Sequence, residues 1–229
     1  MKNLISLVIF FITVQGFSQA EVFEKTVTLD GRRINIDADL ASTIKVTTWN
    51  KDQVQVKVTY ELNDGDLNEA VSVDLGEQSS RIKLKLDVDD KVFRNANVSD
   101  CEKEDASSWG SRNGTKICVT INVELFIPEK TVLDIETVIA DVTMDGIFKE
   151  LDIKSVTGDI DVTWPERQGT ELELKTVTGN IFTDFDFNGK KKKGLPIISS
   201  HKFATIYKGG EGYLKLESVT SNIYLRKGD

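Results

Sequence analysis

Residues 151–160 read Leu-Asp-Ile-Lys-Ser-Val-Thr-Gly-Asp-Ile, and this stretch decides the fold because close copies of it recur. The other copies occupy residues 133–142, 172–181 and 214–223, and their leading leucines are separated by 18, 21 and 42 residues along the chain. Because 42 is twice 21, a degenerate copy is expected near residues 195–206. A β-patterned period near 20 residues is typical of a β-solenoid, in which each copy forms one coil.

The alternation of apolar residues changes phase inside each copy. In residues 151–160 it follows one parity as far as Ser155 and the other parity from Val156 onward. The chain is therefore predicted to bend between these two residues. On this interpretation Val156, Val177 and Val219 point into the core at the corners. The small residue two positions later, Gly158 in this copy, fits a crowded place on the coil.

The residue after that small residue is always Asp or Asn. These four residues are predicted to face outward and to stack in a ladder one strand spacing, ~4.8 Å, apart: Asp141, Asp159, Asn180 and Asn222. An acid/base pair made by Asp141 and Asp159 would point instead to a glycan-active enzyme, a lyase or a hydrolase. The interchange of Asp with Asn favours the structural role, because an amide cannot exchange a proton as a carboxylate does.

Alternation with period two also runs through residues 54–60, 82–88 and 117–127, which predicts strands with one buried face. The predicted fold class is all-β: a β-solenoid, or right-handed parallel β-helix-like roll, of short coils of about 20 residues, preceded by antiparallel or mixed strands. The predicted organisation is a signal peptide at 1–20 and a single domain at 21–229, made of opening strands (21–62), an irregular insertion with a disulfide loop (63–116) and β-repeat coils (117–229).

The first residues have the three-part layout of a secretory signal peptide. Lys2 is followed by an apolar run from Leu4 to Val14, and Ser18 and Ala20 provide small residues at −3 and −1 for cleavage after Ala20. The apolar run is shorter than the ~20 residues of a membrane span, and no later segment reaches that length. We expect an exported protein of the periplasm, outer cell envelope or surroundings, with no transmembrane segment after cleavage.

The net charge of −8 makes nucleic acid an unfavourable partner. Cys101 and Cys118 are an even pair in an exported chain, which predicts one disulfide, with two unpaired thiols as the alternative. Two cysteines and the single His201 are too few for a usual zinc site, and no cofactor motif is present. His201 has no nucleophile elbow near it, so we expect no catalytic residue, no metal and no cofactor.

Two groups of residues outside the repeats are candidates for binding. Trp109 and Arg112 lie among small residues in the loop that the disulfide would close, a composition typical of recognition loops. The alternative is that Trp109 packs back on the sheet. The second group is a basic run that would contact an anionic envelope polymer or lipid, or else form a solvated loop tip: Lys190, Lys191, Lys192 and Lys193.

The repeats resemble a known family. Ile153–Ile160, Leu174–Ile181 and Leu216–Ile223 match its unit L-x-[IL]-x-[ST]-V-x-G-[DN]-I, and Ser42–Trp49 matches its opening pattern. The chain is similar over about residues 26–60 and 117–227 to the putative-adhesin domain family of bacterial envelope proteins, a domain family of unknown function. One departure is Ser221, which stands where the family usually has Gly.

The resemblance implies a β-helical or β-roll envelope domain for which adhesion is the suggested role and no catalytic residues are established. We therefore expect an exported, non-catalytic, adhesin-like binding or scaffolding module. Its partner would be an envelope glycan, an extracellular protein or a cell-surface component. The glycan-active enzyme and an accessory role in envelope stress are the alternatives.

Overall fold

The computed structural model describes residues 20–89, 91, 107–110, 116–187, 197–198 and 202–228 of the chain. These residues are almost entirely strand and turn, with two short 3₁₀ segments, η1 (Asn63–Gly65) and η2 (Asn68–Ala70). The all-β class is therefore confirmed. The described part of the chain contains no helix with the length and apolarity that crossing a bilayer requires.

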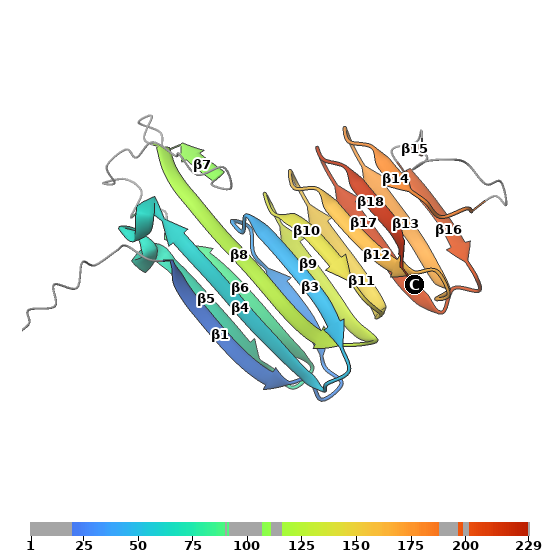
Figure 1. The fold of residues 1–229 in the computed structure, drawn as a ribbon, viewed down its shortest axis with the longest axis horizontal. Coiled ribbons are helices and arrows are strands. Elements are labelled where there is room, and N and C mark those ends of the chain that lie inside the picture. Colours follow the sequence, from blue (N-terminus) through green and yellow to red (C-terminus); the bar gives the residue numbers. More distant parts are fainter. Residues whose placement is uncertain are drawn as a thin grey trace, which may run out of the picture.

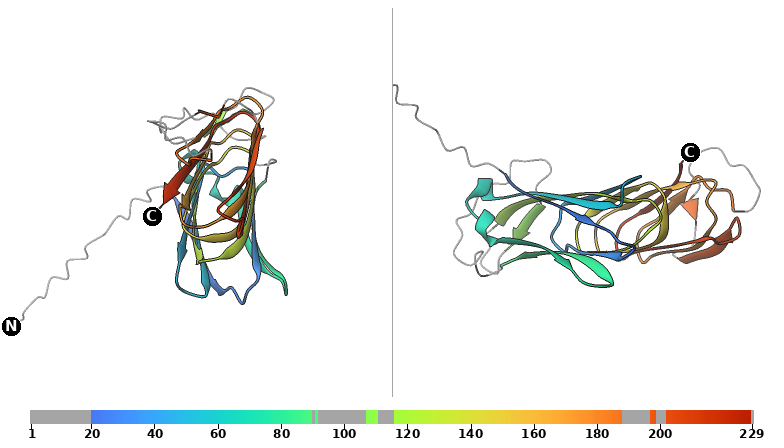
Figure 2. Two further views of the ribbon diagram at one scale, coloured as in Figure 1. Left: turned by 90° about the vertical axis from the view of Figure 1, so that its right-hand side faces the viewer. Right: turned by 90° about the horizontal axis from the view of Figure 1, so that it is seen from below.

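The described strands form two mixed sheets that lie face to face (Figures 1 and 2). In spatial order, sheet A contains β1 (Glu21–Thr28), β4 (Gln53–Leu62), β8 (Lys116–Pro128), β3 (Thr43–Trp49), β10 (Asp141–Asp145), β12 (Ile160–Pro165), β18 (Ile223–Gly228), β14 (Ile181–Thr183) and β15 (Ile197–Ile198), with β7 (Ser107–Gly110) paired to β8. Sheet B contains β16 (Lys202–Tyr207), β13 (Thr170–Thr176), β17 (Gly212–Ser218), β11 (Phe148–Ser155), β9 (Thr131–Thr137), β2 (Arg33–Asp37), β6 (Arg81–Val88) and β5 (Val71–Glu77).

A single apolar layer lies between the two sheets. Alternate residues of each strand point into it, for example Leu151 and Ile153 from sheet B and Ile160 and Val162 from sheet A, all with no exposed surface. Each such side chain contributes about 1.5–3 kcal/mol when fully buried. The period-two pattern of the sequence thus becomes the inward face of each sheet.

The four copies lie side by side, but not in chain order. In sheet B the strand order β9-β11-β17-β13 places the fourth copy between the second and the third, with Leu214 level with Leu151 and Leu172. The prediction of a β-solenoid, in which the copies would follow one another in chain order, is therefore wrong. The strands instead form two mixed sheets. The alternation and spacing of the copies fix how each one turns but carry no information about which copy is its neighbour.

The expected degenerate copy near residues 195–206 is also wrong. In this region β15 and β16 pair antiparallel with β14 and β13 at the ends of the two sheets, so they do not form a further parallel coil. The chain reaches the edge of the molecule, reverses at Lys208–Gly210, where all three residues have positive φ, and returns to fill the place beside the second copy.

The corners between sheet B and sheet A differ from the prediction. Val156, Val177 and Val219 are not buried, since 40%, 54% and 42% of their surface is exposed. The last inward position of each strand belongs instead to a buried hydroxyl residue, Ser155 in the second copy. Its Oγ accepts a hydrogen bond of 3.1 Å from the backbone N–H of Gly158.

The same bond recurs in every copy. It joins the hydroxyl of the last inward residue to the N–H three residues later, in the pairs Thr137–Ala140, Thr176–Gly179 and Ser218–Ser221, with lengths of 3.3, 3.0 and 3.1 Å. Valine cannot take this position because it offers no acceptor, and an unpaired buried N–H costs about 1–3 kcal/mol. The bend therefore falls after the hydroxyl residue, and the valine that follows points to solvent.

The small residue at the corner is required by a close approach between copies. A Cβ on Gly158 would collide with the carbonyl of Ala140, and one on Gly179 would collide with the carbonyl of Ser221. Ser221 itself is accommodated with its hydroxyl donating to the carbonyl of Thr157. The departure from Gly at Ser221 therefore adds a bond between neighbouring copies and leaves the corner bond in place.

The described residues at the start of the expected insertion, 63–89, are more regular than predicted. They include β5 and β6, which pair antiparallel with each other, and β6 pairs in parallel with β2 to extend sheet B. The N-terminal segment that resembles the repeats forms β2 and β3, which pair in parallel with β9 in sheet B and with β10 in sheet A. Residues 90, 92–106 and 111–115 lie outside the described part.

Thr176→Val should destabilise the protein by about 1–3 kcal/mol, because it leaves the N–H of Gly179 without an acceptor. Val177→Asp, one residue later and exposed, should change stability by less than ~0.5 kcal/mol. Urea unfolding of both variants measures the difference. A large loss of stability in Val177→Asp together with a small loss in Thr176→Val would instead support a valine that points into the core.

Candidate functional site

The outer face of sheet B carries rows of charged side chains set by the strand register. One row crosses six strands in the order Lys83, Asn35, Asp134, Asp152, Lys215 and Glu173. A second row, one pleat away, crosses them in the order Lys85, Asp37, Glu136, Lys154, Glu217 and Lys175. Because opposite charges face each other across several of the strands, the rows form cross-strand ion pairs.

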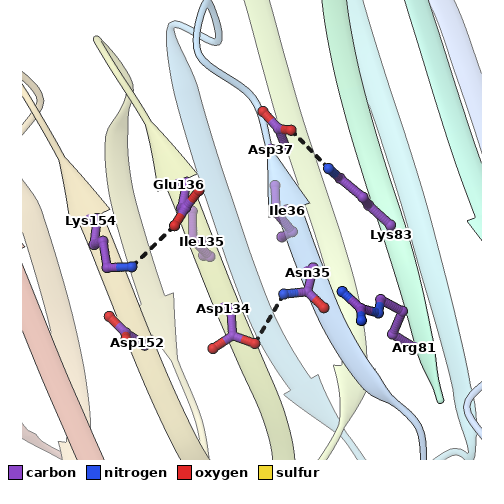
Figure 3. A pocket seen from close by; sticks show the side chains of 10 residues that line it. All are labelled: Asn35, Ile36, Asp37, Arg81, Lys83, Asp134, Ile135, Glu136, Asp152 and Lys154. Atoms are coloured by element: carbon purple, nitrogen blue, oxygen red, sulfur yellow. Dashed lines mark hydrogen bonds and ion pairs between the residues drawn. The ribbon is translucent and has the colours of Figure 1, made fainter.

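A depression of ≈ 310 Å³ lies in the middle of this face (Figure 3). Across it Lys154 Nζ lies 3.1 Å from Glu136 Oε1, and on its far side Lys83 Nζ lies 3.0 Å from Asp37 Oδ2. Each of these surface pairs is worth at most ~1 kcal/mol. The parallel strands fix where these side chains start, and the ion pairs fix the direction in which the side chains point.

Two oxygen atoms in the depression find no donor among the described residues. Asn35 donates through Nδ2 to Asp134 Oδ2 at 3.1 Å, which leaves its own Oδ1 buried and without a partner. Asp152 Oδ1 is also buried and without a hydrogen-bond partner among the described residues. Lys215 Nζ lies 3.9 Å from the other oxygen of this carboxylate, Oδ2. A buried acceptor without a donor is unfavourable, so a ligand that supplies donors gains by binding here.

Burial raises the pKa of Asp152 above its ordinary value, and nearby Lys215 and Lys154 oppose this rise without cancelling it. Burial also raises the pKa of Asp39, and the charges of Asp37 and Glu136 add to that rise. Added positive charge or hydrogen-bond donors are therefore favourable at Asp152 in the depression and at Asp39, beyond the end of β2. No cluster of metal-ligating side chains is found in the described part of the chain.

The predicted ladder residues lie at the beginnings of strands of sheet A, where three of their side chains join one copy to the next. Asp141 Oδ1 accepts the N–H of Asp159 at 2.9 Å, Asp159 Oδ1 accepts the N–H of Asn222 at 2.9 Å, and Asn222 Oδ1 accepts the N–H of Asn180 at 3.0 Å. Their spatial order is that of the copies in the sheets. The two carboxylates predicted as an acid/base pair are thus occupied with backbone donors.

Most of the other predicted site residues lie outside the part of the chain that the structure describes. Trp109 lies on β7, where its backbone pairs with that of Ile117, and its side chain is outside the described residues. Outside them too are Arg112, Cys101, Lys190, Lys191, Lys192 and Lys193. Cys118 lies on β8, where its N–H donates to Asn63 Oδ1 at 2.9 Å, and the Cys101–Cys118 disulfide stays a prediction.

Most residues of the depression are not evident from the sequence. Asp134 and Asp152 occupy the same position in the first and second copies, between the two leading apolar residues. That position is outward by alternation, so a shared acidic patch could have been expected there. Asn35 and Lys83 could not have been added, because the pairing of β2 with β9 and β6 is not visible in the repeat pattern.

No protein-family model matches the chain, and no curated protein matches it either. Among solved structures, the fold is similar to that of a "putative cell adhesion protein" from Clostridium sporogenes, with a TM-score of 0.51 and 11% identity over 92% of this chain and 100% of that one. At this identity the likeness shows the fold alone.

Weaker matches include a "putative lipid binding protein" from Parabacteroides distasonis (12% identity, 72% of this chain, 70% of that one, TM-score 0.31). Another is a "putative adhesin" from Bacteroides fragilis (10% identity, 90% of this chain, 97% of that one, TM-score 0.25). These TM-scores are too low to carry an argument.

Asp152→Asn should raise the melting temperature at pH 7. A carboxylate whose folded pKa is above its unfolded pKa destabilises the fold once it is ionised, and the penalty disappears as pH falls through the folded pKa and then the unfolded one. The gain over wild type should therefore shrink to nothing near pH 3. Asp74→Asn, on the exposed face of β5, controls for the loss of one negative charge. A gain that is constant from pH 7 to pH 3 would contradict this account.

Proposed function

We propose that this protein is an exported, non-catalytic, adhesin-like module that binds a neutral glycan of an envelope or cell surface on the outer face of sheet B. The observation that carries the proposal is the pair of unpartnered oxygens, Asn35 Oδ1 and Asp152 Oδ1, in one depression. Sugar hydroxyls are donors of the kind that these acceptors lack. The surrounding cations, Lys83 and Lys154, then offer donors to sugar oxygens.

Rigidity supports binding at this place. The depression lies on strands β6, β2, β9 and β11, which pair in parallel in sheet B. Neighbouring charges hold the lining side chains in position, so little side-chain entropy would be lost when a ligand arrives. A shallow polar depression on a flat sheet also suits a polymer, which can extend across the rows on both sides.

One observation favours the enzymatic alternative. Asp134 and Asp152 face each other on adjacent strands, and burial raises the pKa of the second, as in the carboxylate pairs of glycosidases. Against this, the carboxylate of Asp134 is engaged by Asn35 at 3.1 Å and by Arg33 at 3.6 Å. A carboxylate oxygen that accepts a hydrogen bond from an amide and pairs with a guanidinium is poorly placed to act as nucleophile or base.

A glycan array followed by biolayer interferometry on the best ligand tests the proposal. Asp152→Ala should weaken binding at least about tenfold, equivalent to ~1.4 kcal/mol. Asp74→Ala on the same face should stay within about twofold of wild type. Binding that both variants retain, or no bound neutral glycan at all, would refute the site. Release of reducing sugar that Asp152→Ala abolishes would establish the enzyme instead.

The export part of the proposal has its own test. Protein recovered from the native cell envelope should begin at Glu21, because Ser18 and Ala20 provide the residues that a signal peptidase recognises. Intact-mass spectrometry measures the N-terminus directly. A mature protein that retains Met1 in the cytoplasmic fraction would contradict export.

A further inference from the structure

Three turns on the edge of the molecule opposite the corners meet at a second depression, of ≈ 500 Å³. Each turn carries the chain from sheet A to sheet B and brings one basic residue to the depression. Lys130 lies between β8 and β9, Lys149 lies at the start of β11, and Arg167 lies between β12 and β13. Three copies of the same connection thus place three cations together.

Hydrogen bonds hold the three turns side by side. The N–H of Lys130 donates to the carbonyl of Ile147 at 2.7 Å, which joins the first turn to the second. Gln168 Nε2 donates to the carbonyl of Phe148 at 2.6 Å, which joins the third turn to the second. The backbone beneath the cations is therefore ordered, although the cationic side chains themselves are exposed.

The charge of this depression is unusual for the molecule. The chain has a net charge of −8, and cations on sheet B such as Lys83 and Lys154 are paired with carboxylates. Lys130, Lys149 and Arg167 form no ion pair with any described residue. Glu211 is the one carboxylate in the lining, so the lining carries three positive charges and one negative, a net +2.

The depression also contains an apolar wall and an acceptor without a donor. Ile147 and Pro165 are half-buried in the lining, above the buried ring of Phe148. Gln168 Oε1 is buried and has no partner in the described part of the chain, and the bond from Nε2 of the same amide fixes its direction. A ligand for this place needs an anionic group, a hydrogen-bond donor and an apolar surface.

We propose that this depression binds a carboxylate-bearing sugar residue of an acidic polysaccharide. The carboxylate would lie among Lys130, Lys149 and Arg167, a sugar hydroxyl would donate to Gln168 Oε1, and the C–H face of the ring would lie on Pro165. A volume of ≈ 500 Å³ is within the range of small-ligand sites. An inorganic anion or an anionic membrane would use the cations but leave Gln168 Oε1 without a donor.

This site goes beyond the function proposed above, and it shares no residue with the depression in Figure 3. The two proposals can therefore fail separately. Loss of neutral-glycan binding in Asp152→Ala concerns sheet B alone, whereas the acidic sugar is tested by substitutions in the turns.

The experiment is calorimetric titration of the full-length mature protein with oligogalacturonate, with neutral dextran and polyacrylate as comparison ligands. We expect oligogalacturonate to bind at the turns, and we expect any binding of dextran, a neutral glycan, to be independent of the turn residues. Polyacrylate, which has carboxylates but no hydroxyls, should bind at least about fivefold more weakly per carboxylate. The double variant Lys149→Ala/Arg167→Ala should lose at least tenfold in affinity for oligogalacturonate.

A matched double variant controls for charge. Lys45→Ala/Lys57→Ala removes two exposed lysines of sheet A that form no ion pair with described residues, and its affinity should stay within about twofold of wild type. If the two double variants lose affinity equally, the effect comes from net charge alone, and the proposed site is wrong. If polyacrylate binds as tightly as oligogalacturonate, the proposal that the site recognises a sugar is wrong. If phosphatidylglycerol vesicles bind more tightly than oligogalacturonate, the ligand is an anionic membrane and not a polysaccharide.

Discussion

The arrangement of the two sheets depends on one hydrogen bond, which joins a buried Ser or Thr hydroxyl to the backbone N–H three residues later. At each corner the chain leaves sheet B and enters sheet A, and the N–H of a small residue such as Gly158 or Gly179 is carried out of the strand ladder into a buried position. The hydroxyl of Ser155 or Thr176 accepts it. Because donor and acceptor are always three residues apart, every corner has the same length, and the strands on both sides keep a common register.

The same corner geometry determines what the molecule presents to solvent. With the hydroxyl residue turned inward, the following valine is exposed, and the Asp or Asn after the small residue reaches the N–H of the neighbouring copy. Both sheets therefore have regular outer faces, on which equivalent residues of neighbouring copies lie one strand spacing apart. On sheet B this regularity sets Asp134 beside Asp152, and at the opposite edge it sets Lys130 near Lys149. Neighbouring copies thus supply part of each proposed site.

The sequence predicted the strands, the inward face and the repeat unit, because alternation and copy number are local properties. It failed at Val156, since a strand alternation rule assigns apolar residues inward and takes no account of the acceptor that a buried N–H needs. It also failed on the place of the fourth copy, because alternation and spacing do not determine that Leu214 lies between Leu151 and Leu172. The depression on sheet B requires pairing of β2 with β6 and β9, which no local pattern contains.

Native-state hydrogen exchange at the corners tests the central claim most directly. If the hydroxyl bonds hold the corners, the amides of Ala140, Gly158, Gly179 and Ser221 should exchange as slowly as amides in the middle of β11, through global unfolding. Exposed turn amides such as that of Arg167 should exchange many orders of magnitude faster. Corner amides that exchange as fast as that of Arg167 would show that the corners open locally, and would contradict the dependence of the fold on this bond.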